Sequence, residues 1–142
     1  MFRVLNKYAL HLAFLQAWTA TLGSLYFSEI LGLEPCPLCW YQRILMYPLV
    51  ILFAVAIVRH DKNITYYALP LSAIGAVIAL YQYLLQMTPL GLSKSLVCSA
   101  FVSCSQIDKI YFGFITIPFL SLMAFLVISI LMVLLLGQRK KL

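Results

Sequence analysis

The chain has 142 residues, of which 64% are hydrophobic and only 10% are charged, and its mean hydropathy is +1.00. Soluble domains carry about 25% charged residues, so this composition excludes a water-soluble globular protein and predicts an integral membrane protein. The net charge of +6 does not indicate a nucleic-acid partner, because the basic residues stand in short clusters at the ends of apolar stretches, as membrane topology predicts.

Apolar stretches of about 20 residues are long enough to cross a bilayer as α-helices. The sequence has them at residues 8–28, 38–58, 66–87 and 112–136, with no internal repeat and no linker. We therefore predict an all-α integral membrane protein, a four-transmembrane-helix bundle with residues 1–142 as a single domain. The last span is an almost unbroken run of Leu, Ile, Val and Met, which predicts a lipid-facing helix without chemistry.

The basic residues also predict the orientation of the bundle. They precede the first span, join the second to the third, and follow the fourth: Arg3, Lys7, Arg59, Lys62, Arg139, Lys140 and Lys141. The other two connections hold only Lys94 and Lys109. Because positive residues stay in the cytoplasm, we expect both termini inside and both short cysteine-bearing loops outside a bacterial cell membrane. Disulfides persist on that outer side.

The second span opens with the sequence Cys-Pro-Leu-Cys at residues 36–39. Two cysteines at this spacing can form a redox dithiol, half of a zinc site or a haem anchor, but a haem anchor would need histidine where this chain has Trp40. Pro37 suits the first position of a helix, so Cys36 is expected at the N-cap and Cys39 in the first turn. Both sulfurs then lie where the positive end of the helix favours a thiolate.

Polar side chains close to this helix start are candidates for binding a ligand. Arg43 follows Cys39 by four residues, so it projects from the same helix face one turn deeper. A cation there could stabilise a thiolate or an electron-rich oxygen. Gln82 and Gln86 share a face near the end of the third span. Either amide could donate to a ligand carbonyl or bond to a neighbouring helix, and Gln86 is the better candidate for the ligand.

The connection between the third and fourth spans carries a second pair of cysteines, Cys98 and Cys104, in an apolar stretch. A bridge between them would close a tight turn, which is feasible if their Cα atoms come within about 7 Å. Two cysteine pairs on one face favour an electron relay through mixed disulfides. The loop pair suits exchange with a protein thiol, and the helix-start pair suits a lipid-soluble acceptor. Since the sequence has no dinucleotide, haem or iron–sulfur motif, membrane quinone is the expected acceptor.

The segment Cys36-Pro37-Leu38-Cys39-Trp40-Tyr41-Gln42-Arg43 resembles the motif of the DsbB family of disulfide-bond formation proteins. The four spans and the second cysteine pair are also similar to that family, and the short distance between Cys98 and Cys104 resembles its BdbC-like branch. The resemblance implies a quinone-dependent protein-disulfide oxidoreductase without a metal. Such an enzyme reoxidises a DsbA-like or BdbD-like thiol oxidase of the thioredoxin fold. It passes the electrons to menaquinone or ubiquinone and so to the respiratory chain.

Carried over residue by residue, the resemblance implies two redox-active disulfides, Cys36–Cys39 and Cys98–Cys104. The first pair would be coupled to quinone, with Cys39 and Arg43 at the quinone site, and the second pair would oxidise the partner. The histidine that the family has near the end of the third span has no clear counterpart here, and Tyr83 stands near its place.

Three other interpretations stay open. Four thiolates could form a tetrahedral zinc site. The chain could be a structural four-span scaffold with two inert disulfides. It could also be an enzyme similar to vitamin K epoxide reductase, although in that family the Cys-X-X-Cys motif lies late in the bundle.

Overall fold

The structure is a computed structural model, and it describes residues 2–30, 32, 37–87 and 117–141. These ranges contain helices and no strands. The elements are α1 (Phe2–Leu25), a π-helical segment η1 (Tyr26–Ile30), α2 (Pro37–Arg59), α3 (Ile64–Met87) and α4 (Ile117–Lys141). The predicted all-α fold with four long helices is confirmed.

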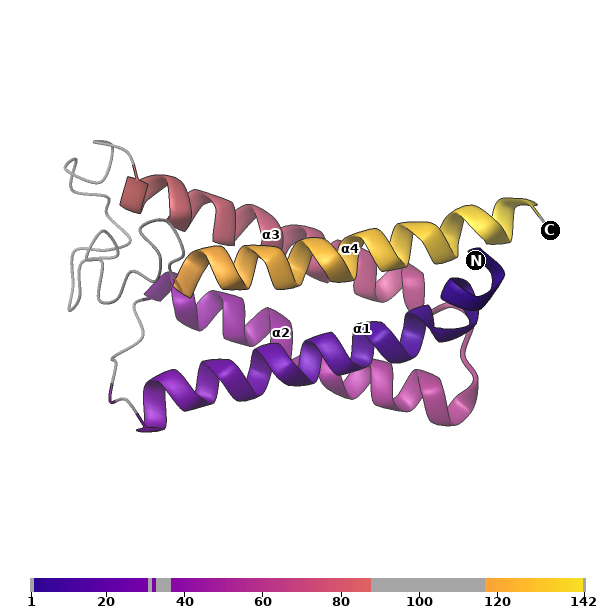
Figure 1. Cartoon of the computed structure of the whole chain (residues 1–142), viewed down its shortest axis with the longest axis horizontal. Coiled ribbons are helices and arrows are strands. Elements are labelled where there is room, and N and C mark those ends of the chain that lie inside the picture. The colour runs from indigo at the N-terminus through magenta and orange to yellow at the C-terminus, as the bar shows by residue number, and fades with distance from the viewer. Residues whose placement is uncertain (1, 31, 33–36, 88–116, 142) are drawn as a thin grey trace.

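The four helices alternate in direction and form an antiparallel bundle (Figure 1). Each packs mainly against two neighbours, in the ring order α1, α2, α3, α4. Both chain termini and the α2–α3 turn lie at one end, which we call the terminal end (Figure 1). Helices α2 and α4 begin at the opposite end, which we call the Cys39 end. Helices α2, α3 and α4 contain segments long and apolar enough to cross a membrane, namely Leu38–Arg59, Ile64–Leu84 and Phe119–Lys141.

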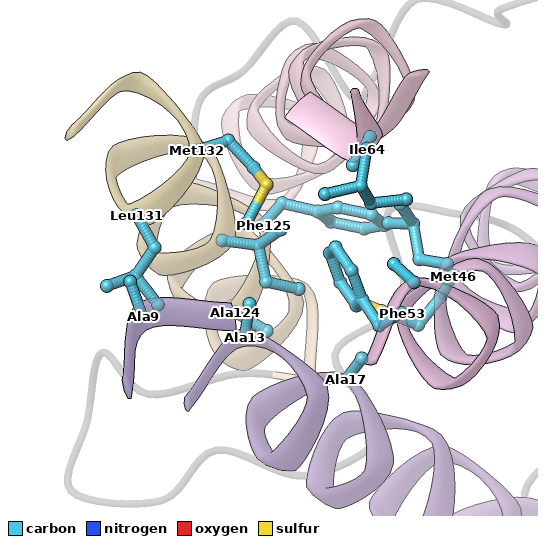
Figure 2. Packing of buried hydrophobic residues seen from close by; sticks show 14 of the residues in the cluster. Ala9, Ala13, Ala17, Met46, Phe53, Ile64, Ala124, Phe125, Leu131 and Met132 are labelled. Atoms are coloured by element: carbon cyan, nitrogen blue, oxygen red, sulfur yellow. The ribbon is translucent and has the colours of Figure 1, made fainter. Parts of the chain in front are cut away.

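Alanines, two aromatic rings and several aliphatic and methionine side chains fill the interior of the bundle. Ala9, Ala13 and Ala17 recur every four residues along α1 and are all buried, which lets α1 approach its neighbours closely. Phe53 of α2 and Phe125 of α4 point toward one another in the centre (Figure 2). Lipid tails are as apolar as these side chains, so close packing rather than escape from water holds the helices together.

Helix α4 has an inward face as well as the lipid-facing surface that the sequence predicted. It packs against both α1 and α3, and one of its faces, with Phe125, Ile128 and Met132, is fully buried. Other side chains of α4, including Ile130 and Val133, are exposed. The sequence did not predict the inward face because lipid-facing and protein-facing surfaces of a membrane helix are both apolar, so a uniform apolar run does not distinguish them.

The α3–α4 contact depends on the absence of a side chain at Gly75. A Cβ atom at this position would overlap Cε1 of the Phe125 ring. We expect Gly75→Ala to destabilise the bundle by about 1–3 kcal/mol through overpacking, measured as a lower thermal unfolding midpoint in detergent. Gly23→Ala is the matched control, since a Cβ there would meet nothing within 4 Å. Equal midpoints for the two variants would contradict the predicted overpacking.

Candidate functional site at the start of helix α2

Cys39 lies in the first turn of α2, which begins at Pro37 as predicted. The cysteine is half-buried, and its sulfur faces α3. There the side-chain Nε2 of Gln82 donates a hydrogen bond to Cys39 Sγ at 3.2 Å. The Cys39 thiol in turn donates a longer hydrogen bond, of 3.7 Å, to Oε1 of the same amide. The sulfur therefore has an N–H donor from a neighbouring membrane helix.

Gln82 belongs to a chain of hydrogen bonds that joins three helices. Nε2 of Gln42, on α2, donates to Oε1 of Gln82 at 2.7 Å. The hydroxyl of Ser121, on α4, donates to Oε1 of Gln42. Gln42 and Gln82 are only 6% and 2% exposed, and buried amides of this kind are nearly always hydrogen-bonded. We call Ser121, Gln42 and Gln82 the amide relay, because they link α4 through α2 and α3 to Cys39.

Arg43 lies one turn after Cys39 but reaches the opposite neighbour, α1. Its Nε donates to the hydroxyl of Ser24 at 2.9 Å, and its Nη2 donates to the Ser24 carbonyl at 3.0 Å. The guanidinium also stands over the ring of Trp40, with Cζ 5.5 Å from the ring centroid. None of its hydrogen bonds to described residues goes to Cys39. These contacts fix the guanidinium near the Cys39 end while using only part of its set of N–H donors.

Comparison with known proteins identifies the family. The profile of the family described as Disulfide bond formation protein DsbB matches residues 6–135. The chain belongs to the DsbB family. DsbB proteins have four membrane helices. Length and composition identify three of them here, in α2, α3 and α4, so α1 is the remaining membrane helix. Membership also implies oxidoreductase activity in disulfide formation.

Curated relatives of this DsbB-family chain carry matching names. Disulfide bond formation protein C of Bacillus subtilis (strain 168) is 48% identical over 132 residues, which cover 93% of this chain and 95% of the relative. A Probable disulfide formation protein of Coxiella burnetii (strain CbuK_Q154) is 45% identical over 133 residues, or 94% and 90% of the two chains. Probable disulfide formation protein C 1 of Bacillus anthracis is 46% identical over 125 residues, or 88% and 89%. No solved structure matches the chain significantly.

The structure tests the predicted site residues of this DsbB-family protein unevenly. Cys39 and Arg43 lie at the same end of the bundle, on sides of α2 that face different neighbours. Gln86 belongs to α3, but its side chain is outside the described part of the structure. Gln82, which the sequence analysis favoured less as a ligand-binding residue, is the glutamine that contacts Cys39.

Tyr83, which stands near the place of the family's histidine, packs on Phe119 with ring centroids 5.7 Å apart. Three predicted cysteines lie outside the described residues: Cys36, Cys98 and Cys104.

Sequence reasoning assigned no role to three residues that complete the contacts of the site. Gln42 follows Cys39 by three residues, a spacing that puts both on one helix face. Ser24 and Ser121 are small hydroxyl residues in apolar helices. Hydroxyls and amides in membrane helices usually bond to neighbouring helices, so these polar interruptions were the available signal.

Proposed function

We propose that this DsbB-family chain reoxidises an extracytoplasmic thiol oxidase of the thioredoxin fold, of the DsbA or BdbD type, and passes the electrons to membrane quinone. Disulfide bond formation in secreted proteins would depend on this activity. The observation that carries the proposal is the position of Cys39, in the first turn of a membrane-spanning helix with an amide donor on its sulfur. A thiolate held there can react with a lipid-soluble acceptor at the membrane surface.

Electrons would pass from the partner to the loop pair, and from the loop pair to the helix-start pair. The reduced partner attacks the Cys98–Cys104 disulfide through a mixed disulfide, so the partner is oxidised and the loop pair becomes a dithiol. That dithiol reduces the Cys36–Cys39 disulfide by the same exchange. The helix-start dithiol then loses two electrons and two protons and re-forms its disulfide. Quinone, when bound, would be the acceptor of those two electrons and two protons and would leave as quinol.

The residues around Cys39 fit a quinone, which presents carbonyl oxygens on an apolar ring. Arg43 is held by Ser24 and Trp40, and its contacts with described residues leave N–H groups available to stabilise an oxygen that gains negative charge. Gln86 is a second candidate donor, from the last turn of α3. The surrounding helix surface is apolar, as a lipid-soluble molecule requires. Menaquinone and ubiquinone both satisfy this chemistry.

The distribution of charge supports an extracytoplasmic position for the Cys39 end. The helical basic residues at the terminal end include Arg59, Arg139, Lys140 and Lys141. Arg43 is the one basic residue of the described helices at the Cys39 end. Positive residues stay on the cytoplasmic side, so we propose that the termini lie in the cytoplasm and the cysteine loops outside the cell membrane.

A vesicle assay tests the reaction and the orientation together. Membrane vesicles containing the chain are prepared right-side-out and inverted, loaded with quinone, and mixed with a reduced DsbA-type oxidase. We expect right-side-out vesicles to oxidise the added partner and form quinol in equal amounts, and inverted vesicles to do neither. Without quinone, each chain should oxidise at most about two molecules of partner, one for each of its two disulfides. Absence of partner oxidation in both orientations would favour a scaffold with inert disulfides.

A further inference from the structure

Three hydrogen bonds of the amide relay run toward the sulfur of Cys39, and one longer bond runs back from the Cys39 thiol to Oε1 of Gln82. The Ser121 hydroxyl donates to the Gln42 carbonyl, the Gln42 amide donates to the Gln82 carbonyl, and the Gln82 amide donates to Sγ. An amide side chain has one accepting end and one donating end. The Gln42 amide holds Oε1 of Gln82 on the side of α2, and this orientation turns the N–H end of Gln82 toward the sulfur.

The distances and the burial support this direction. Gln82 Nε2 is nearer to the sulfur than Oε1, at 3.2 Å against 3.7 Å, and Oε1 receives the short bond from Gln42 at 2.7 Å. Both glutamine side chains are almost completely buried, so water does not compete for these groups. Hydrogen bonds linked in a chain polarise one another in such surroundings.

A donor on sulfur matters for redox chemistry because the thiolate is the reactive form of cysteine. A hydrogen bond to a charged acceptor is roughly twice as strong as one to a neutral acceptor, so an N–H on Sγ favours the thiolate over the thiol. Stability alone gives a weak reason for the relay, since a single interhelical hydrogen bond in a membrane contributes little to stability.

We propose that the amide relay is a positioning device that keeps the Gln82 N–H on Cys39 and thereby holds this sulfur as a thiolate. Gln82 acts on the sulfur directly, whereas Gln42 and Ser121 act by orienting Gln82. The inference rests on the proposed function in one respect, which is that Cys39 is the cysteine that delivers electrons to the acceptor. It assigns to α3 and α4 a part in the chemistry of a thiol carried by α2.

Alkylation of a single thiol tests the relay. The full-length chain with Cys36, Cys98 and Cys104 changed to serine is reduced in detergent and treated with iodoacetamide over a range of pH. We expect Gln82→Met to shift the midpoint of the rate–pH profile upward by about one pH unit. Gln42→Leu and Ser121→Ala should give smaller upward shifts. At high pH, the alkylation rate of these variants should equal or exceed that of the parent chain, because a less stabilised thiolate is more nucleophilic.

Ser72→Ala is the matched control. Ser129 Oγ donates to Ser72 Oγ at 3.0 Å across the α3–α4 interface, without contact to Cys39, so this variant should leave the profile unchanged. Ser121→Ala removes one oxygen atom and therefore tests the relay even if a Gln82 variant fails to insert. An unchanged midpoint in Ser121→Ala and Gln82→Met would overturn the proposal. So would a rate lowered by the same factor at every pH, which indicates altered access to the thiol.

The alkylation assay contains neither quinone nor partner, so it separates this inference from the proposed function. Shifted profiles in a chain that reduces no quinone would support the relay and refute the proposed function. Normal quinone reduction with unshifted profiles would refute the relay and leave the proposed function standing.

Discussion

Replacing either cysteine of the helix-start pair, by Cys36→Ser or Cys39→Ser, is expected to abolish quinone reduction. Two electrons leave the protein as a dithiol becomes a disulfide, and a single thiol cannot complete that step. The quinol formed in the vesicle assay should fall to the level of vesicles without the chain. The position of Cys39 at the start of a membrane helix motivates this expectation.

The loop pair should give a different defect. Cys98→Ser and Cys104→Ser are expected to block oxidation of the partner, while added quinone still oxidises the chemically reduced helix-start pair. Thiol trapping after each addition reads the two steps separately. A loop variant that oxidises its partner at the normal rate would show that the proposed order of the pairs is wrong.

Replacing Arg43 is expected to raise the KM for quinone, modestly in Arg43→Lys and more severely in Arg43→Ala. A hydrogen bond to a charged group contributes about 1.5–3 kcal/mol, which corresponds to roughly a 10- to 100-fold effect for the alanine variant. Lysine keeps the charge, but it lacks the planar fork that here holds both the hydroxyl and the carbonyl of Ser24. Steady-state quinone reduction at varied quinone concentration measures the effect.

Two further variants distinguish quinone binding by Arg43 from anchoring of Arg43 to lipid head groups. Arg59→Lys changes an exposed arginine at the terminal end and should leave the KM unchanged. Ser24→Ala keeps the Arg43 charge but removes one of its fixed acceptors, so an intermediate KM is expected. An anchor that snorkels to head groups would tolerate lysine, and an unchanged KM in both Arg43 variants would exclude Arg43 from the quinone site.

The sequence was sufficient where local rules determine structure. Pro37 marks a helix start because proline needs no N–H partner there, so Cys39 could be placed in a first turn. It was insufficient where the answer depends on how deeply one helix lies against another. Gln82 and Gln86 share a face at a spacing of one turn, and only the packing of α3 on α2 decides which amide meets Cys39. The inward face of α4 could not be predicted either, since its apolar residues surround the helix.

Ser121, Phe125 and Ser129 recur every four residues on α4, and together they fix its rotational register. A helix that is apolar all round can turn about its own axis in lipid with little change in solvation. Here a turn by one residue position, about 100°, would separate Ser121 from Gln42 and Ser129 from Ser72. It would also move the Phe125 ring out of the space above Gly75. The hydrogen bonds of Ser121 and Ser129 and the absence of a side chain at Gly75 therefore select one rotational orientation for this otherwise apolar helix.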